Sequence, residues 1–128
     1  MSLLENKNIS YYSKVLDVLA QRHRVIANNI ANANTPGYRA KDIEFKDVLS
    51  EIVDLRKEQS SPSEFDNELQ DLEVKEVSDN SGFDNNGIND VDLYGEMAKL
   101  STNTLLYKAY AQLMIMRLKQ INLAIKER

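Results

Sequence analysis

Residues 92–126 read DLYGEMAKLSTNTLLYKAYAQLMIMRLKQINLAIK, and this stretch decides the fold. Apolar residues recur along it at alternating steps of four and three, the 3.5-residue spacing of helices that supercoil about a partner. The positions of this seam are Leu93, Met97, Leu100, Thr104, Tyr107, Ala111, Met114, Leu118, Ile121 and Ile125, of which only Thr104 is polar. Such a helix is roughly 50 Å long, whereas a globule of this chain length is roughly 35 Å across. The sequence therefore predicts an elongated molecule.

The N-terminal segment carries a second seam of the same spacing. Its positions are Tyr12, Leu16, Leu19, His23, Ile26, Ile30 and Ala33. Seams at both ends of the chain predict that the first and last segments pair as a coiled-coil-like hairpin. We therefore expect a mainly α fold in which residues 1–40 and 90–128 form paired terminal helices.

The C-terminal segment has more apolar surface than one partner helix covers. A second stripe lies off the seam and consists of Leu105, Leu106, Ala109, Tyr110, Leu113, Ile115 and Met116. Either a third helix from the middle of the chain or other subunits would cover this stripe. The sequence leaves both alternatives open.

The middle of the chain differs from its ends in charge. The net charge is +3 over residues 1–40, −10 over residues 41–90 and +3 over residues 91–128. We expect a short amphipathic helix over residues 41–58 and an acidic, turn-rich excursion over residues 59–89, in which residues 72–77 alternate like a half-buried strand. No stretch concentrates enough Lys and Arg to predict nucleic acid as a partner.

Residues 27–38, ANNIANANTPGY, predict the end of the first helix. Thr35 precedes a proline and is disfavoured in the helical region, so the helix should end near Asn34. Residues 35–38 then predict a type II turn, with Gly37 at the position of positive φ. Four asparagines lie off the seam, and their amides both donate and accept, which suits hydrogen-bond ladders between repeated copies. A solvated helix end with ordinary turn chemistry is the alternative.

This twelve-residue segment resembles the signature of the bacterial flagellar rod, hook and hook–filament junction proteins. Residues 91–114, VDLYGEMAKLSTNTLLYKAYAQLM, resemble the terminal helix of that family. The chain's shortness and residues 22–45, RHRVIANNIANANTPGYRAKDIEF, are most similar to the short proximal-rod members. The resemblance covers residues 10–49 and 89–125. It implies an assembly signature and turn formed by Asn28, Asn29, Ile30, Ala31, Asn32, Ala33, Asn34, Thr35, Pro36, Gly37 and Tyr38.

The resemblance implies a structural subunit of the proximal rod, which polymerises through its terminal helices, transmits torque and lines the export channel. The implied partners are copies of itself, other rod and membrane-ring or junction proteins and, transiently, the flagellar export gate. The implied location is the basal body, reached across the inner membrane without a cleavable signal peptide. A small acidic helical chaperone or adaptor of the same export system is the alternative function.

Proteins similar to this one carry a short pattern for recognition by the export gate. A phenylalanine is followed four residues later by a large apolar residue, and Phe45 and Leu49 match this pattern. The same pair also belongs to one face of an amphipathic helix, whose members are Phe45, Val48, Leu49, Ile52 and Leu55. The two interpretations are compatible with each other.

The composition argues against catalytic and metal chemistry. The chain has no cysteine and a single histidine, which excludes thiolate nucleophiles and multi-histidine metal sites. His23 lies on a helix seam, where neither a nucleophile nor an orienting acid is expected, and residues 79–90 lack the register of a calcium loop. We predict no enzyme activity, no cofactor and no metal site. The longest apolar run, residues 113–116, also predicts no direct membrane insertion.

Overall fold

A computed structural model describes residues 3–58, 61–79 and 91–127 of the chain. Within these ranges the elements are α1 (Leu3–Ala31), β1 (Lys41–Asp42), α2 (Phe45–Glu58), α3 (Pro62–Asp71), β2 (Val77–Ser78) and α4 (Leu93–Lys126). The two short strands pair antiparallel, with Lys41 opposite Ser78 and Asp42 opposite Val77. The predicted mainly helical fold is confirmed. No helix in the described residues combines the length and apolar character needed to cross a membrane.

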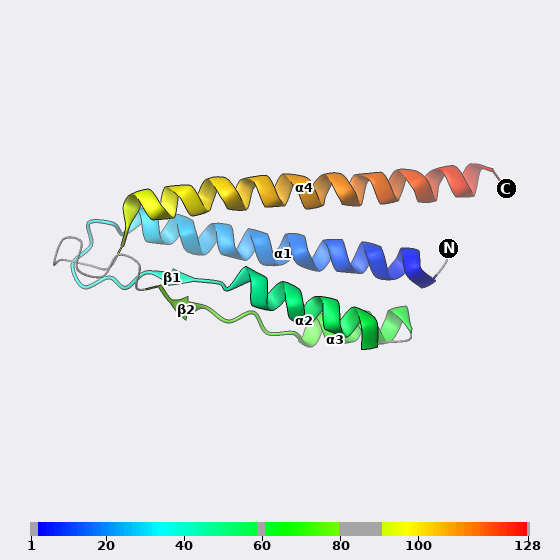
Figure 1. The fold of residues 1–128 in the computed structure, drawn as a ribbon, viewed down its shortest axis with the longest axis horizontal. Helices are drawn as coiled ribbons and strands as arrows, with labels where there is room; N and C mark the ends of the chain where they lie inside the picture. The colour runs from blue at the N-terminus through cyan, green and yellow to red at the C-terminus, as the bar shows by residue number, and fades with distance from the viewer. Residues whose placement is uncertain (1–2, 59–60, 80–90, 128) are drawn as a thin grey trace.

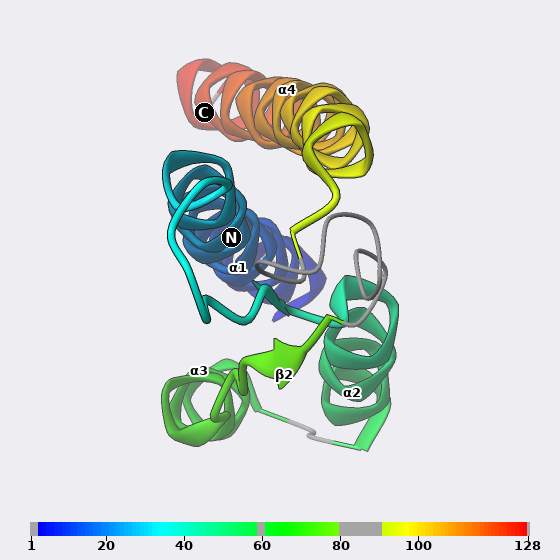
Figure 2. The same cartoon turned by 90° about the vertical axis from the view of Figure 1, so that its left-hand side faces the viewer.

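The helices form three layers along one long axis (Figure 1). α1 and α4 run antiparallel side by side, so that both chain ends lie at the same end of the molecule. The end-on view in Figure 2 shows α1 in the middle, with α4 on one side and α2 and α3 on the other. The predicted pairing of the two terminal helices in an elongated molecule is therefore confirmed.

The hydrophobic core surrounds α1, because this helix is covered on two sides. Of its predicted seam, Leu19 and Ile26 are fully buried, Tyr12 and Leu16 are half-buried, and His23 is exposed. A neighbouring stripe of α1 is buried as well and consists of Tyr11, Val15, Val18 and Val25. A seam pattern describes contact with a single partner helix, so it does not reveal a second covering layer.

The second layer consists of α2 and α3. α2 begins at Phe45, after β1, and buries Val48 and Ile52 against α1. α3 lies within the segment for which the composition predicts only an acidic excursion. It places the fully buried Phe65 and the buried Leu69 in the core. The short strand that follows forms at Val77–Ser78, later than the alternation over residues 72–77 suggests.

A local signal for α3 is present in the sequence. The Ser61 hydroxyl accepts a hydrogen bond from the backbone N–H of Glu64, at 3.2 Å, and Pro62 occupies the first helical position. Ser or Thr followed three residues later by Glu, with proline after the cap, is a helix-start signature. The high charge and turn-rich composition of the segment obscure this signature.

An aromatic cluster joins three of the helices near the middle of the molecule. Tyr12 and Phe45 lie with their ring centroids 6.3 and 6.5 Å from the ring of Tyr110 on α4. Tyr11 lies 6.4 Å from the same ring, and the Arg56 guanidinium stacks over the Tyr11 ring at 5.2 Å. Burial and a hydrogen bond with Tyr110 raise the pKa of Tyr11 to about 12. The cluster ties α4 to α2 across α1.

Candidate assembly site

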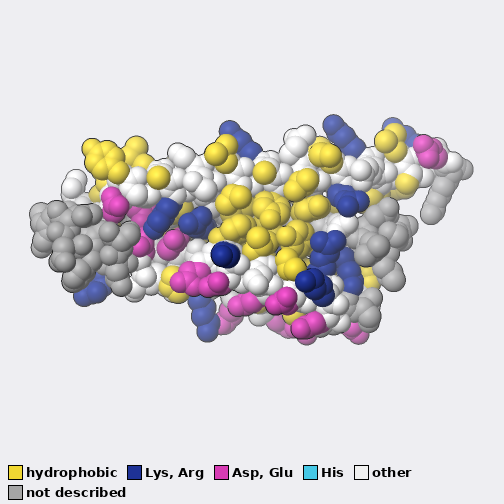
Figure 3. Space-filling view, in the orientation of Figure 1, with side chains coloured by type: hydrophobic (Ala, Val, Ile, Leu, Met, Phe, Trp, Pro, Cys, Tyr) yellow, Lys and Arg dark blue, Asp and Glu magenta, His cyan; other side chains and the backbone are white. Residues whose placement is uncertain are grey.

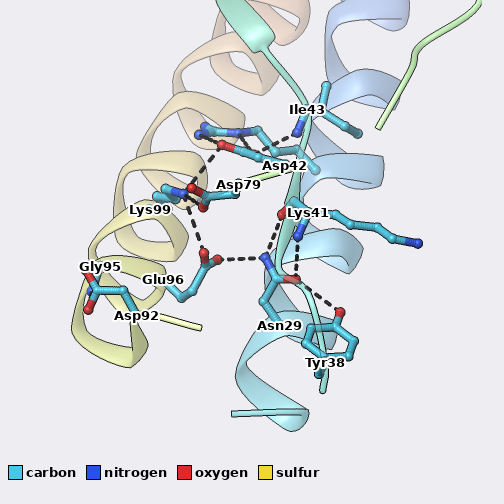
Figure 4. A network of polar contacts seen from close by, with 11 residues as sticks. Asn29, Tyr38, Lys41, Asp42, Ile43, Asp79, Asp92, Gly95, Glu96 and Lys99 are labelled. Atoms are coloured by element: carbon cyan, nitrogen blue, oxygen red, sulfur yellow. Dashed lines mark hydrogen bonds and ion pairs between the residues drawn. The ribbon is translucent and has the colours of Figure 1, made fainter. Parts of the chain in front are cut away.

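Asn29 connects three parts of the chain at the end of the molecule where α1 stops and α4 starts (Figure 4). It is fully buried. Its amide Nδ2 donates to the backbone carbonyl of Lys41, at 2.6 Å, and to Glu96 Oε2 on α4, at 3.1 Å. Its Oδ1 accepts from the Tyr38 hydroxyl and from the backbone N–H of Lys41, each at 3.1 Å. All four hydrogen-bonding positions of the amide are therefore used inside the chain.

A network of ion pairs extends from the Asn29 amide and centres on Lys99 of α4. The Lys99 ammonium forms ion pairs with Asp79, with Glu96 at 3.4 Å and with Asp42 at 3.6 Å. Asp42 in turn accepts a hydrogen bond from Arg22 on α1, at 3.1 Å. The backbone N–H of Asp79 also donates to the carbonyl of Ala40. The network therefore holds α1, α4 and the β1–β2 pair together.

Glu96 is the buried carboxyl group at the centre of this network, with a side chain that is 1% exposed. Burial raises the pKa of Glu96, and the nearby Asp79 raises it further, against the opposing effects of the Asn29 hydrogen bond and the Lys99 charge. Burial lowers the pKa of Lys99, but Asp79, Glu96 and Asp42 outweigh this effect, so its pKa is raised overall. Both shifts favour the protonated form, which is a neutral carboxyl group at Glu96 and a charged ammonium at Lys99.

The raised pKa of Glu96 predicts a pH dependence of stability. Above the ordinary value of 4.5, an unfolded chain releases this proton while the folded chain still holds it, so the free energy of unfolding falls as pH rises through the folded pKa. Glu96→Gln should lack this contribution. Urea unfolding between pH 4 and pH 7 should show a steeper fall for the natural chain than for Glu96→Gln. Parallel curves, or the same change in the exposed control Glu51→Gln, would contradict the prediction.

The turn after α1 has the features that the type II prediction requires. The backbone N–H of Tyr38 donates to the carbonyl of Thr35, at 3.2 Å, and Gly37 has a φ of +76°. α1 ends at Ala31, three residues before the predicted end, and residues 32–34 form a turn. This turn returns the chain so that Tyr38 and Lys41 reach Asn29.

The turn makes a prediction about Gly37. A Cβ added there would have no atom within 4 Å, so the cost of a substitution is conformational rather than steric crowding. Gly37→Val should lower the free energy of unfolding by about 1–2 kcal/mol, because a β-branched residue disfavours positive φ. Gly37→Asn is the matched control, since asparagine tolerates this region. Denaturant unfolding of both variants tests this, and equal losses would refute it.

The remaining asparagines of the signature are placed differently from Asn29. Asn28 and Asn34 are exposed, and Asn32 is half-buried with its amide donating to the Asn28 carbonyl at 2.8 Å. Thr35 donates its hydroxyl to Asn32 Oδ1 at 3.1 Å. Asn29 therefore cannot contribute to a ladder between copies. The other residues of the signature are exposed or half-buried, namely Ile30, Ala31, Ala33, Pro36 and Gly37.

The inward face of α4 differs from the seam that its sequence predicts. Its buried positions are Glu96, Asn103 and Ile121, and the Asn103 amide donates to the Leu19 carbonyl at 2.9 Å. Among the predicted seam residues, Leu100, Thr104, Ala111 and Met114 are half-buried, whereas the exposed ones are Leu93, Met97, Tyr107, Leu118 and Ile125. Glu96 and Asn103, which have hydrogen-bond partners on α1, thus occupy inward positions of α4. Many apolar side chains of α4 lie on its outward stripe instead.

This outward stripe carries the large apolar side chains that stay exposed in the described residues. Every large hydrophobic side chain that is exposed there belongs to α4, from Leu93 to Ile125. In Figure 3 apolar side chains appear along the edge formed by α4, interspersed with basic ones. Leu106 and Tyr110 from the second predicted stripe pack on the core, while Leu105, Leu113, Ile115 and Met116 remain exposed. α2 and α3 therefore do not provide the cover, because they lie on the opposite side of α1 from α4.

The gate pattern lies in the folded part of the chain. Phe45 begins α2 and Leu49 lies one turn later, and both are half-buried against the hydrophobic core. Their packing agrees with the amphipathic-helix interpretation and does not test recognition by the gate.

His23 lines a hollow of about 400 Å³ between α1 and α4, with Arg24, Thr104 and Lys108 among its neighbours. None of the described residues that line this hollow carries a carboxylate, and the Thr104 hydroxyl donates to the Leu100 carbonyl. In the described residues no group of three acidic or histidine side chains is arranged to hold a metal ion. Most of the segment weighed as a calcium loop, residues 80–90, lies outside the described residues.

The chain is similar in sequence to known proteins, both in the signature segment and over most of its length. Residues 16–39 match the family model described as flagella basal body rod protein. A Borreliella burgdorferi protein named flagellar basal body rod protein FlgB is 30% identical over 94% of this chain and 96% of its own length. Proteins of the same name from Borrelia hermsii and Aquifex aeolicus are 31% and 25% identical over 88% and 95% of this chain, and over 91% and 95% of their own lengths. These similarities cover nearly the whole chain and agree with its paired terminal helices. The chain therefore belongs to the flagellar basal body rod protein family, in its FlgB group.

Proposed function

We propose that this chain is a polymerising subunit of the flagellar proximal rod and that the outward face of α4 is its main contact with neighbouring subunits. The observation that carries the proposal is the run of exposed apolar side chains along α4. Leu105 is 68% exposed and Tyr94 is 84% exposed. Apolar surface of this extent is rarely left uncovered on a monomer and marks interaction sites.

The polar network supports a mechanical role. Asn29, Glu96 and Lys99 tie the start of α4 to the end of α1 with hydrogen bonds and ion pairs that are largely buried. Such a network limits bending between the two helices, because any change in their spacing breaks a buried polar contact. A stiff helix pair suits a subunit that transmits torque and forms the inner wall of an export channel. Family membership favours this role over the alternative of an export chaperone.

We extend the proposal to the route of the subunit. Other rod and membrane-ring or junction proteins are proposed axial neighbours, and the subunit reaches the basal body through the export gate without a cleavable signal peptide. Phe45 and Leu49 pack on the core in the folded chain. The export gate would therefore bind them before α2 packs against α1. Recognition of an unfolded segment agrees with passage through a narrow channel.

The proposal is tested by a charge placed on the outward face of α4. Leu105→Glu should leave the melting temperature of the purified chain nearly unchanged, because the side chain makes little intramolecular contact. It should abolish rod formation beyond the membrane ring, seen by electron microscopy of isolated basal bodies, and abolish motility. Ser101→Glu, at an exposed polar position of the same helix, is the matched control and should assemble.

Two outcomes would overturn the proposal. One is normal rods and swimming with Leu105→Glu. The other is recovery of the chain from the cytoplasm in a stable complex with an exported client but not from basal bodies, which would favour the chaperone function.

A further inference from the structure

The last turns of α4 combine exposed apolar side chains with positive charge. Residues 114–126 contain three cations, Arg117, Lys119 and Lys126, and no acidic residue. Leu123 is 60% exposed and Ile115 is 45% exposed. In Figure 1 this end of α4 extends past the start of α1. Helical spacing places Ile115, Lys119 and Lys126 on one face, opposite the side that buries Ile121.

A groove of complementary character lies between α2 and α3. It encloses about 740 Å³, and its apolar lining includes Val48, Leu55 and Leu72. One stripe of α2 contributes the carboxylates Asp47, Glu51, Asp54 and Glu58, and Glu44 lies just before this helix. A second bank of carboxylates faces them from α3 and the segment after it, namely Glu68, Asp71 and Glu73. Lys75 is the one cation among the lining residues that the structure describes.

These charges form no ion pair within the described part of their own chain. The ion pairs found there involve none of the groove carboxylates, and neither Lys119 nor Lys126 takes part in one. A hydrogen bond with Asp47 and repulsion by its charge raise the pKa of Glu44, as expected for crowded like charges. Figure 3 shows acidic side chains gathered along the edge that α2 and α3 form, and basic ones along α4.

We infer that the basic, apolar end of α4 from one copy of this chain docks in the acidic groove between α2 and α3 of a second copy. The occupant is a second copy because α1 lies between the two surfaces within one molecule (Figure 2), so α4 cannot reach its own groove. The inference deepens the proposed function and rests on it, since it names the partner surface for one end of the α4 face.

The proposed contact joins two different surfaces of the same chain. A head-to-tail contact of this kind leaves one free groove and one free helix end on every pair, so it propagates instead of closing a dimer. Lys119 and Lys126 meet the α2 stripe, while Leu123 and Ile115 cover the apolar floor. Opposite charge selects the register, and apolar burial supplies the affinity.

Cysteine cross-linking tests the contact directly, because the chain has no cysteine of its own. One batch of full-length chain carries Leu123→Cys and a second carries Asp54→Cys, and the two are mixed at high concentration and oxidised. A disulfide between the two batches can only be intermolecular. We expect its yield to exceed by at least about tenfold that of control pairs using Ser101→Cys on α4 or Lys46→Cys on α2, because docking raises the local concentration. Equal yields in all pairs would overturn the inference.

Charge reversal tests the electrostatic part with the same cross-link. Lys119→Glu with Lys126→Glu should lower the yield about tenfold, and so should Glu51→Lys with Glu58→Lys, because each places like charges opposite one another. Mixing the two reversed chains should restore the yield, and raising the salt from 0.1 M to 1 M should weaken the natural contact. All four positions are exposed or at the groove rim, so circular dichroism should show unchanged folding. Failure of the reversed pair to restore the yield would overturn the inference.

The two proposals fail in different ways. Loss of rods with Leu105→Glu, together with no specific cross-link, would keep the proposed function and remove this contact. A specific cross-link together with normal rods in Leu105→Glu would keep the contact and remove the proposed role of the wider α4 face.

Discussion

Asn29→Asp is expected to lower the free energy of unfolding at neutral pH by about 3–5 kcal/mol, the loss typical of an uncompensated buried charge. Asn29 is fully buried and donates to Glu96, which is almost fully buried itself. The substitution keeps the shape of the side chain but replaces the donating amide with an acceptor. A second carboxylate then faces Glu96, and the Lys41 carbonyl loses its donor. Urea unfolding, followed by circular dichroism, measures the loss.

A second change separates electrostatics from packing. In the double variant Asn29→Asp with Glu96→Gln, the new amide can donate to the new carboxylate, so part of the lost stability, about 1–3 kcal/mol, should return. Asn34→Asp, in the same segment but exposed, is the matched control and should change stability by less than about 0.5 kcal/mol. Similar losses for Asn29→Asp and Asn34→Asp would mean that Asn29 does not hold the two helices together.

Phe65→Ala is the second change with a large expected effect, a loss of about 3–5 kcal/mol. Phe65 is the largest fully buried side chain among the residues that the structure describes, and it attaches α3 to the core around α1. Truncation removes apolar contact and leaves a cavity that the short α3 cannot fill by moving as a unit. Thermal and denaturant unfolding should show a large fall in midpoint, or no cooperative transition if the whole stability is smaller than this loss.

Two control variants show whether the loss in Phe65→Ala comes from lost buried volume. Phe65→Leu keeps most of the volume and should cost less than about 1.5 kcal/mol. Leu105→Ala removes an apolar side chain that the isolated chain leaves exposed, and should change the stability of the monomer by less than about 0.5 kcal/mol. If Phe65→Ala and Leu105→Ala unfolded at the same midpoint, α3 would not contribute to the core.

Local features of the fold can be predicted from residues that lie close together in the sequence. Pro36 and Gly37 predict the turn because proline restricts the residue before it and glycine admits positive φ, and the structure has the expected hydrogen bond and φ at this turn. The two long helices follow from apolar periodicity sustained over many turns. Ser61 and Glu64 also carry a local signal, for the start of α3, but composition alone does not reveal it.

The contacts between buried polar groups cannot be predicted from nearby residues in the sequence. Four asparagines lie within residues 28–34, and nothing local distinguishes Asn29 from the others, because its partner Glu96 is 67 positions away. Glu96, Lys99, Asp42 and Asp79 are likewise absent from the sequence prediction, although together they form the polar centre of the candidate site. The spacing of Glu96 and Lys99 on one helix is the single local signal among them.

The sequence by itself determined the two long terminal helices, the short helix after the turn, the turn itself, the elongated shape and, through the resemblance of residues 10–49 and 89–125, the family. These features depend on steric preferences and apolar spacing within a few residues or on one extended pattern. Only the tertiary structure decided which face of α4 points inward, that α1 is covered on both sides, and that Asn29 is the residue joined to Glu96. Those outcomes depend on contacts between segments distant in sequence, where buried polar pairs place Glu96 and Asn103 inward and leave the apolar stripe of α4 outward.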